Sequence, residues 1–169
     1  GVAITSRDIT DRMQIENALR ESEERFRSAF ANAVTGMARV APDGRFLEVN
    51  TAFLATFGFS EDELRHRTLD DLAHPDDRAA LAEHLHRLTS GATQATQFEG
   101  RYVDHQQHML WGLLGASVVH AGDAPYLICQ IQDITARKEQ EQRLLRQAQH
   151  DALTSLPNRL LFMERLDPA

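Results

Sequence analysis

The chain has 169 residues, of which 42% are hydrophobic and 25% charged, so we expect one ordinary domain with connecting segments rather than disorder. Its net charge of −7, with 18 basic residues scattered among 25 acidic ones, argues against a nucleic-acid partner, which requires clustered Lys and Arg. The single cysteine, Cys129, excludes an internal disulfide and any Cys-x-x-Cys metal site.

Residues 11–31 are predicted to form a connector helix with one apolar stripe. The apolar side chains follow 4-3-4-3 spacing, with Ser22 in the gap, while the other faces of the helix are charged. The stripe consists of Ile15, Leu19, Phe26, Ala29 and Phe30. We expect it to cover the free face of a sheet or to serve in a dimer.

A hairpin and a short helix are predicted next. Pro42-Asp43-Gly44 supplies a turn between extended runs at 36–41 and 45–50. "NTAFLATFG" at 50–58 predicts a short helix that ends at Gly58.

Two further helices are expected before the chain returns to strands. "SEDE" at 60–63 is a capping box, in which Ser60 and Glu63 satisfy each other's backbone donors. A longer helix is predicted to start near "HPDD" at 74–77 and to end at Gly91. Its apolar positions are Leu81, Leu85 and Leu88.

Three more strands are predicted, at 93–103, 107–119 and 125–132. The middle strand is apolar on both faces, which predicts that both are covered. One face carries Leu110, Leu114, Ala116 and Val118 around Gly112, and the other carries Met109, Trp111 and Leu113. In the last strand Leu127, Cys129 and Ile131 point one way. Five antiparallel strands with short helices on one face make an α+β fold.

A short motif occurs twice: "RDIT" at 7–10 returns as "QDIT" at 132–135, 125 positions later. In each copy the chain is expected to leave a sheet and enter a polar helix. Thr10 or Thr135 is placed to cap the first turn of that helix.

In this order the elements resemble a PAS domain, a small sensory and interaction fold. The resemblance covers residues 22–135, and we place the domain itself at 32–135. The similar pieces are "SEERFRSAFANAVTGMARVAPDGRFLEVN", "NTAFLATFGFSEDEL", "HPDDR", "LWGLLGASVVHAG" and "QIQDIT". "DIT" is a common last element of such domains, so residues 1–10 resemble the tail of a preceding PAS domain.

The end of the chain resembles the opening of a GGDEF domain, the diguanylate cyclase fold, whose usual entry is DxLTxLxNR. The matching residues are Asp151, Leu153, Thr154, Leu156, Asn158 and Arg159. We therefore expect 151–169 to begin a truncated cyclase domain without its catalytic half, so that this chain catalyses nothing. A generic loop with Pro157 at the start of a helix is the alternative.

The resemblance implies a module that dimerises and passes a signal through a linker helix, 136–150, to the cyclase domain in cis. The longer protein would make cyclic di-GMP from GTP, with or without a phosphodiesterase domain. Asp133, Ile134 and Thr135 would be the signal relay. The linker could equally be a solvated spacer. A histidine kinase output is disfavoured, because no His-Glu-Leu-Arg box follows the helix.

The alternative function is a receptor whose bound metabolite or haem drives that signal. Small or aliphatic groups could line its pocket or complete a packed core: Gly112, Leu114, Ala116, Cys129 and Ile131. No cofactor is predicted. Photoreceptor-type flavin requires a Cys before "HPDD", where none occurs. The positions that bind the flavin ring in that family fall on Gly112 and Ile131, whose side chains cannot donate a hydrogen bond.

Haem remains open through His84 and His86 on the long helix, although its ligand position aligns nearer Ala79 or Ala80. No metal site is predicted, because His84 and His86 do not share a helix face. The chain opens on Gly1 rather than Met, so we expect a fragment of a longer protein. It carries no membrane-spanning run or signal peptide, and we expect a cytoplasmic location.

Overall fold

The computed structural model describes the backbone of residues 2–154 and the side chains of residues 8–151. Within this part of the chain, five strands form one antiparallel sheet in the order β2-β1-β5-β4-β3. The strands are β1 (Gly36–Val40), β2 (Phe46–Val49), β3 (Ala95–Val103), β4 (Met109–Val119) and β5 (Tyr126–Asp133). All five were predicted, with ends that agree to within two residues.

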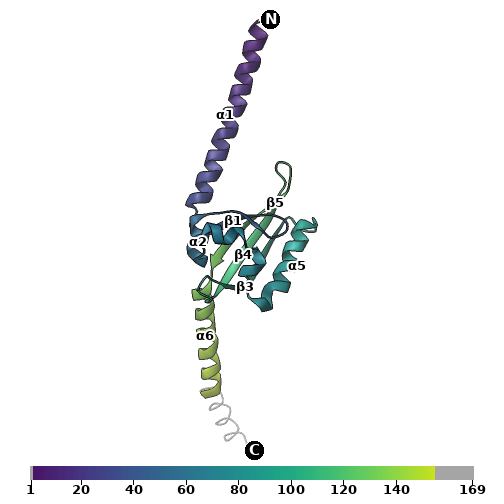
Figure 1. Cartoon of the computed structure of the whole chain (residues 1–169). Coiled ribbons are helices and arrows are strands. Elements are labelled where there is room, and N and C mark those ends of the chain that lie inside the picture. The colour runs from purple at the N-terminus through teal and green to yellow at the C-terminus, as the bar shows by residue number, and fades with distance from the viewer. Residues whose placement is uncertain (1, 155–169) are drawn as a thin grey trace, which may run out of the picture.

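Short helices connect β2 to β3 and cover one face of the sheet (Figure 1). They are α2 (Thr51–Phe57), α3 (Glu61–Arg65), α4 (Leu69–Leu72), the 3-10 helix η1 (Pro75–Asp77) and α5 (Arg78–Thr89). The predicted α+β class and the arrangement of helices on one face of a five-stranded sheet are therefore confirmed.

Local signals set the ends of these helices. Gly58 ends α2 with φ at +73°, a conformation that glycine adopts without steric cost. Ser60 and Glu63 form the predicted capping box at the start of α3, since each side chain accepts from the other residue's backbone N–H.

Asn50 holds together the start of α2 and the chain on either side of it. Its buried side chain accepts from the N–H groups of Phe53 and Met37 at 2.9 and 2.8 Å. It donates to the carbonyls of Phe30 and Thr35 at 2.8 and 3.1 Å. One amide therefore caps α2 and fixes the segment that enters β1.

The core lies between the sheet and the short helices. Aromatic rings run through it from β2 to β3, with centroid separations of 5.4, 4.8 and 6.1 Å along the series Phe46, Phe53, Phe57 and Tyr102. The leucines predicted for the long helix, Leu81, Leu85 and Leu88, are buried against this core. Burial of this apolar surface is the main stabilising contribution.

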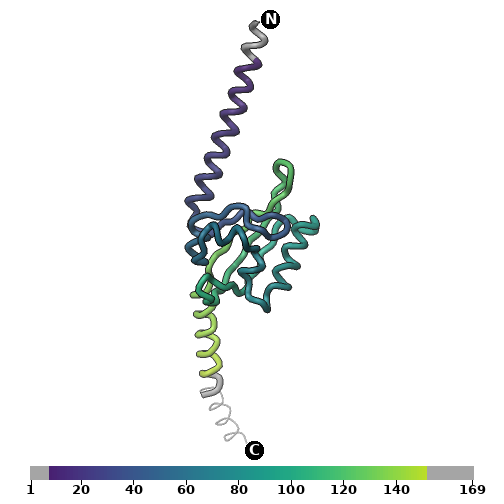
Figure 2. Tube along the Cα trace, viewed as in Figure 1, coloured from purple at the N-terminus to yellow at the C-terminus, as the bar shows by residue number. Residues whose placement is uncertain are grey.

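The helix α1 (Val2–Asn32) does not place its apolar stripe over the sheet, as one prediction had it. It projects away from the domain as one continuous helix (Figures 1 and 2). Of the stripe residues Ile15, Leu19, Phe26 and Phe30, Phe30 is buried, whereas Ile15 is 69% exposed. The stripe does not cover the sheet within this chain, because α1 has no turn residue that would fold it back before β1 begins.

The first copy of the repeated motif also differs from its prediction. Residues 7–10 lie inside α1, so Thr10 does not begin a helix and no strand ends there. A strand requires a neighbour for its backbone hydrogen bonds, and the described residues before Thr10 form no such pair, so the helix continues. The tail of a preceding domain at 1–10 stays a prediction.

The middle strand β4 is covered more fully on one face than on the other. Its inward residues Leu110, Leu114 and Ala116 are buried, as predicted. On the outward face Met109 is exposed, and Trp111 and Leu113 are half-buried. The prediction that both faces of β4 are covered was wrong, because α1 does not pack against the outward face.

The predicted linker helix lies within α6 (Thr135–Thr154), which leaves the domain at the end opposite α1 (Figure 2). Asp151 lies in the last turn of α6, and residues 155–169 of the expected cyclase start lie outside the described residues. None of the described helices combines the length and apolarity that a membrane span requires.

Candidate functional site

The predicted relay residues lie where β5 ends and α6 begins. The backbone N–H and the hydroxyl of Thr135 both donate to Asp133 Oδ1, at 2.9 and 2.6 Å. The same hydroxyl oxygen accepts the backbone N–H of Trp111 at 3.0 Å. Thr135 does not cap α6 as predicted, because its hydroxyl accepts from Trp111 rather than from an N–H of the helix. It instead attaches the first turn of α6 to the neighbouring strand β4.

Ile134 completes this junction. Its side chain is 3% exposed, and its N–H donates to the Trp111 carbonyl at 2.9 Å. Its own carbonyl accepts the N–H of Lys138 at 2.9 Å, which is the first helical bond of α6. The last paired residues of β4 and β5 are Gly112 and Asp133. The bond between Ile134 and Trp111 therefore continues the pairing one residue beyond this last pair.

Cations of α6 bind the outward face of the sheet beside this junction. Glu99 of β3 accepts from Lys138 Nζ at 2.8 Å and from Arg137 Nη2 at 2.9 Å. The hydrogen bond from Lys138, followed by its charge and by Arg137, lowers the pKa of the Glu99 carboxyl. Lys138 Nζ also lies 4.9 Å from the centroid of the Trp111 ring.

The three predicted relay residues lie together at this junction, but sequence reasoning missed their partners. Trp111, Glu99 and Lys138 were not assigned a role in the junction. The sequence held a partial signal for Arg137, the other cation that binds Glu99. The 125-residue spacing of the repeat also aligns Arg12 with Arg137. The contact between Trp111 and Thr135 spans 24 positions and depends on strand register, which local patterns do not reveal.

The candidate pocket residues are brought together on the inner face of β4 and β5. Leu114 pairs with Ile131 and Ala116 with Cys129 across the two strands, and all four side chains are buried. An added Cβ at Gly112 would lie 2.8 Å from Cδ2 of Tyr102.

The ring of Tyr102 therefore occupies the space that the absent side chain of Gly112 leaves. These residues form a packed core, the second of the two alternatives, and the ligand pocket stays a prediction.

Burial also determines the protonation of the two titratable groups in this core. It raises the pKa of the Cys129 thiol to about 12, and it raises the pKa of the Tyr102 hydroxyl. Both groups are neutral near pH 7, so Cys129 is not an activated nucleophile. The Tyr102 hydroxyl is buried without a hydrogen-bond partner among the described residues.

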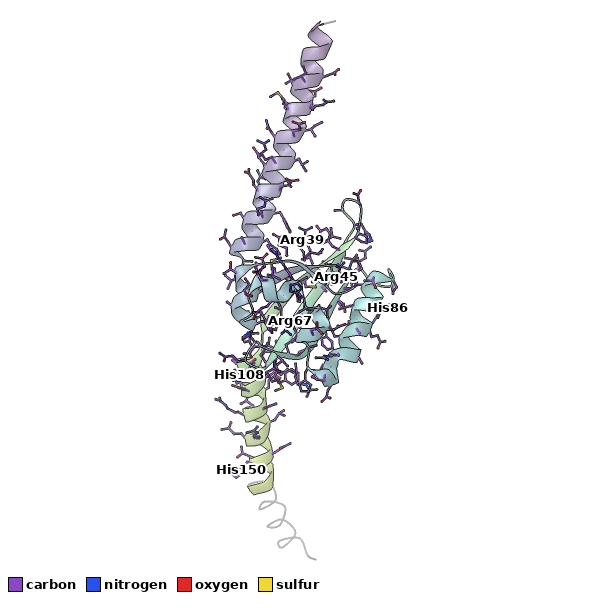
Figure 3. All side chains as sticks on the ribbon, in the orientation of Figure 1. Arg39, Arg45, Arg67, His86, His108 and His150 are labelled. Atoms are coloured by element: carbon purple, nitrogen blue, oxygen red, sulfur yellow. The ribbon has the colours of Figure 1, made fainter. Side chains whose placement is uncertain are left out.

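The two candidate haem ligands, His84 and His86, have different surroundings. His84 is half-buried against β3, where Nδ1 lies 2.8 Å from Thr96 Oγ1 and the ring lies 5.2 Å from that of Phe98. His86 is exposed on the outer side of α5 (Figure 3). Across the described side chains, no group of three or more His, Cys, Asp or Glu could hold a metal ion.

An open groove of about 640 Å³ lies where α1 meets the outward side of the sheet. Arg39, labelled in Figure 3, lies at the foot of α1 and contributes to this groove. Its guanidinium binds Glu48 Oε2 at 3.1 Å and lies 4.5 Å from the Tyr126 ring centroid. Phe26 of the α1 stripe is also among the lining residues.

Comparison with known proteins places these features in context. A family model described as the PAS fold matches residues 24–134. The chain is 36% identical over 124 residues to the probable diguanylate cyclase DgcE of Escherichia coli K12, covering 72% of this chain and 11% of that protein. It is 28% identical over 142 residues to the sensor histidine kinase TmoS of Ectopseudomonas mendocina, covering 83% and 15%.

A solved structure shows the same fold. The PAS domain of an HTR-like protein from Haloarcula marismortui has a TM-score of 0.59 and 22% identity, covering 72% of this chain and 99% of that one. The chain spans only a small part of the two curated relatives, as the 11% and 15% coverage shows.

Proposed function

The chain belongs to the PAS family, and we propose that it dimerises and relays a signal through α6 to a diguanylate cyclase domain. The observation that carries the proposal is the junction at Asp133, Ile134 and Thr135. There Thr135, the first residue of α6, accepts the N–H of Trp111, and Ile134, the residue before α6, donates to the Trp111 carbonyl.

The junction supports a relay because α6 has few other attachments to the domain. Beyond its first two turns, α6 is exposed and projects away from the sheet (Figure 1). A small change in how β4 and β5 pair at Gly112 and Asp133 would therefore change the direction of the whole helix. The far end of a helix of 20 residues moves much further than its base.

Two observations favour a cyclase as the output. The DxLTxLxNR-like motif begins at Asp151, directly after the linker, and the E. coli relative carries the name of a diguanylate cyclase. The similarity to a sensor histidine kinase supports a signalling role in general. The motif that follows α6 distinguishes the two outputs and favours cyclic di-GMP synthesis.

Dimerisation is supported by apolar side chains that α1 and α6 leave exposed. Ile15, Leu19 and Phe26 on α1, and Leu144 and Leu145 on α6, are all more than 40% exposed. A second copy of the chain could bury them, with its own α1 against the groove beside Arg39 and Tyr126. Two cyclase domains must meet to join two GTP molecules, which a dimer would favour.

Native mass spectrometry of the chain, beside denatured spectra, tests the dimer and the alternative receptor function together. We expect a dimer without excess mass, and a monomer for the Leu19→Glu, Phe26→Glu variant. Excess mass that is lost on denaturation would instead identify a bound ligand. A wild-type monomer at micromolar concentration would contradict the dimer.

The output is tested on the longer protein that contains this chain. We expect it to convert GTP to cyclic di-GMP, and we expect Thr135→Val to alter the rate or its regulation. Absence of cyclic di-GMP from a folded protein that binds GTP would overturn the cyclase assignment.

A further inference from the structure

Arg101 of β3 binds the segment that starts α5 through its backbone and its side chain. Its backbone N–H donates to Asp77 Oδ2 at 2.8 Å, and its carbonyl accepts the N–H of His74 at 2.9 Å. Its guanidinium donates to both oxygens of Asp77, at 3.0 and 2.7 Å. This is the two-pronged geometry that makes an Arg and carboxylate pair strong and directional.

The pair is partly shielded from water, since the Arg101 and Asp77 side chains are 29% and 18% exposed. The hydrogen bonds and the charge of Arg101 lower the pKa of the Asp77 carboxyl, and Asp77 in turn raises the pKa of Arg101. Asp77 immediately precedes α5, whose leucines are buried in the core. A change in core packing that shifts α5 would therefore shift Asp77.

The same guanidinium reaches the junction with α6. Arg101 is the cross-strand partner of Trp111, and its Cζ lies 5.9 Å from the centroid of the Trp111 ring. Lys138 of α6 contacts that ring at 4.9 Å and binds Glu99, which lies two residues before Arg101 on β3. Contacts thus continue from Asp77 through Arg101, Trp111 and Lys138 to Glu99.

Charge makes this arrangement sensitive to Asp77. Two cations contact one ring, which is favourable only while each has its own carboxylate: Asp77 for Arg101, and Glu99 for Lys138. Loss of the Asp77 charge would release Arg101 from its fixed position beside Lys138. It would leave Arg101 with the exposed carboxylate of Asp76, at 4.0 Å, as its remaining charged partner. The first turn of α6 would then be held less firmly.

We propose that Arg101 is a positioning residue that couples the start of α5 to α6 through the Trp111 ring. This route passes through the Trp111 ring, whereas Thr135 binds the backbone of the same residue. It rests on the proposed function, because it names the path by which a change in the core reaches the relay helix. The signal would enter at α5 and leave at Lys138.

Hydrogen–deuterium exchange of the whole chain tests the coupling at a distance. Asp77→Asn keeps a side chain of the same shape that can still accept from the Arg101 backbone, but it removes the charge. We expect the helix-bonded amides at the start of α6, residues 138–141, to exchange about two- to fivefold faster. This is the factor that corresponds to the free energy of one such contact between a cation and a ring. Lys138→Met should remove the response to Asp77→Asn, because the two changes break one path.

Glu48→Gln is the matched control. It breaks a similar arrangement, in which Arg39 binds Glu48 and lies over the Tyr126 ring, but which has no contact with α6. We expect Glu48→Gln to leave exchange in residues 138–141 unchanged. Arg101→Lys, which keeps the charge and loses the two-pronged geometry, should give an intermediate increase and replaces Asp77→Asn if that variant does not fold.

Three results would overturn the coupling. In the first, Asp77→Asn speeds exchange in η1 and β3 but not in α6. In the second, the effects of Asp77→Asn and Lys138→Met on exchange in α6 are additive. In the third, exchange rises equally throughout the domain. Cyclic di-GMP synthesis by the longer protein separates this inference from the proposed function. A response to Thr135→Val without one to Asp77→Asn refutes only the Arg101 path, whereas a response to neither refutes the relay itself.

Discussion

The hydroxyl of Thr135 binds the backbone N–H of Trp111, although the two residues belong to different elements and lie 24 positions apart. The same hydroxyl donates to Asp133, so its orientation is set by two partners. Any movement of β4 relative to β5 at this end must stretch one of these bonds or carry α6 with it. We therefore propose Thr135 as the residue at which effects on folding and on the proposed relay can be separated.

Replacing Thr135 with Val should disconnect α6 from β4 more than it destabilises the domain. The loss of the hydroxyl that accepts from Trp111 and donates to Asp133 costs about 1 kcal/mol of the free energy of unfolding, which a domain of this size tolerates. Exchange of the helix-bonded amides of residues 138–141 should rise, while urea unfolding changes little. Thr135→Ser retains the hydroxyl and should resemble the wild type, and equal losses of stability and of relay for Thr135→Val would contradict the assigned role.

Asn50 should be one of the most destabilising polar positions to change. Asn50→Ala leaves the N–H groups of Met37 and Phe53 and the carbonyls of Phe30 and Thr35 without their partner. We expect a loss of about 2–4 kcal/mol in the free energy of unfolding, measured with urea. Asn50→Asp keeps the cap on α2 but cannot donate to the two carbonyls, so a stability equal to that of the wild type would show that those donations contribute little.

The elements that the sequence predicted well carry their signals locally. The end of α2 was identified from Gly58 and the start of α3 from Ser60 and Glu63, because a helix end depends on a few neighbouring residues. The alternation of Leu127, Cys129 and Ile131 likewise showed which side of β5 is buried.

The features that were missed depend on partners distant in the sequence. An apolar stripe such as Ile15 and Leu19 shows that a helix face is suited to burial, but it does not name the partner, and within this chain the stripe remains exposed. The contacts of Lys138 with Glu99 and Trp111 require the register of three strands to be known. The place of Asp133, Ile134 and Thr135 between β5 and α6 could therefore be predicted, whereas the side chains around them could not.

Tyr102 offers a test of how the core is filled. Because its buried hydroxyl has no partner among the described residues, Tyr102→Phe should be neutral or should stabilise the domain by up to about 1 kcal/mol. Tyr102→Ala removes the ring that packs against Gly112 and should cost about 3–5 kcal/mol. Thermal unfolding of the two variants checks both values. A clear loss of stability in Tyr102→Phe would show that the hydroxyl has a partner, such as a bound water or ligand.

The pair of Asp77 and Arg101 should make part of the stability dependent on pH. The pKa of Asp77 is lower in the folded protein than its usual value of 3.8, chiefly because its carboxylate accepts hydrogen bonds from Arg101. Its stabilising contribution is therefore complete above about pH 4, near the unfolded value, and is lost as the pH falls through the lower folded value.

Asp77→Asn should consequently lower the free energy of unfolding at pH 7, and the difference from the wild type should shrink below pH 4. Nearby charges do not alter the sign, since His74 and Arg101 both lower the pKa of Asp77. Urea unfolding at pH 7, 4 and 3 measures the difference. Glu48→Gln is measured in the same way as the comparison. If the difference in free energy of unfolding between the wild type and Asp77→Asn stays constant down to pH 3, the Asp77 charge contributes nothing to stability. The electrostatic basis for coupling α5 to α6 would then be removed.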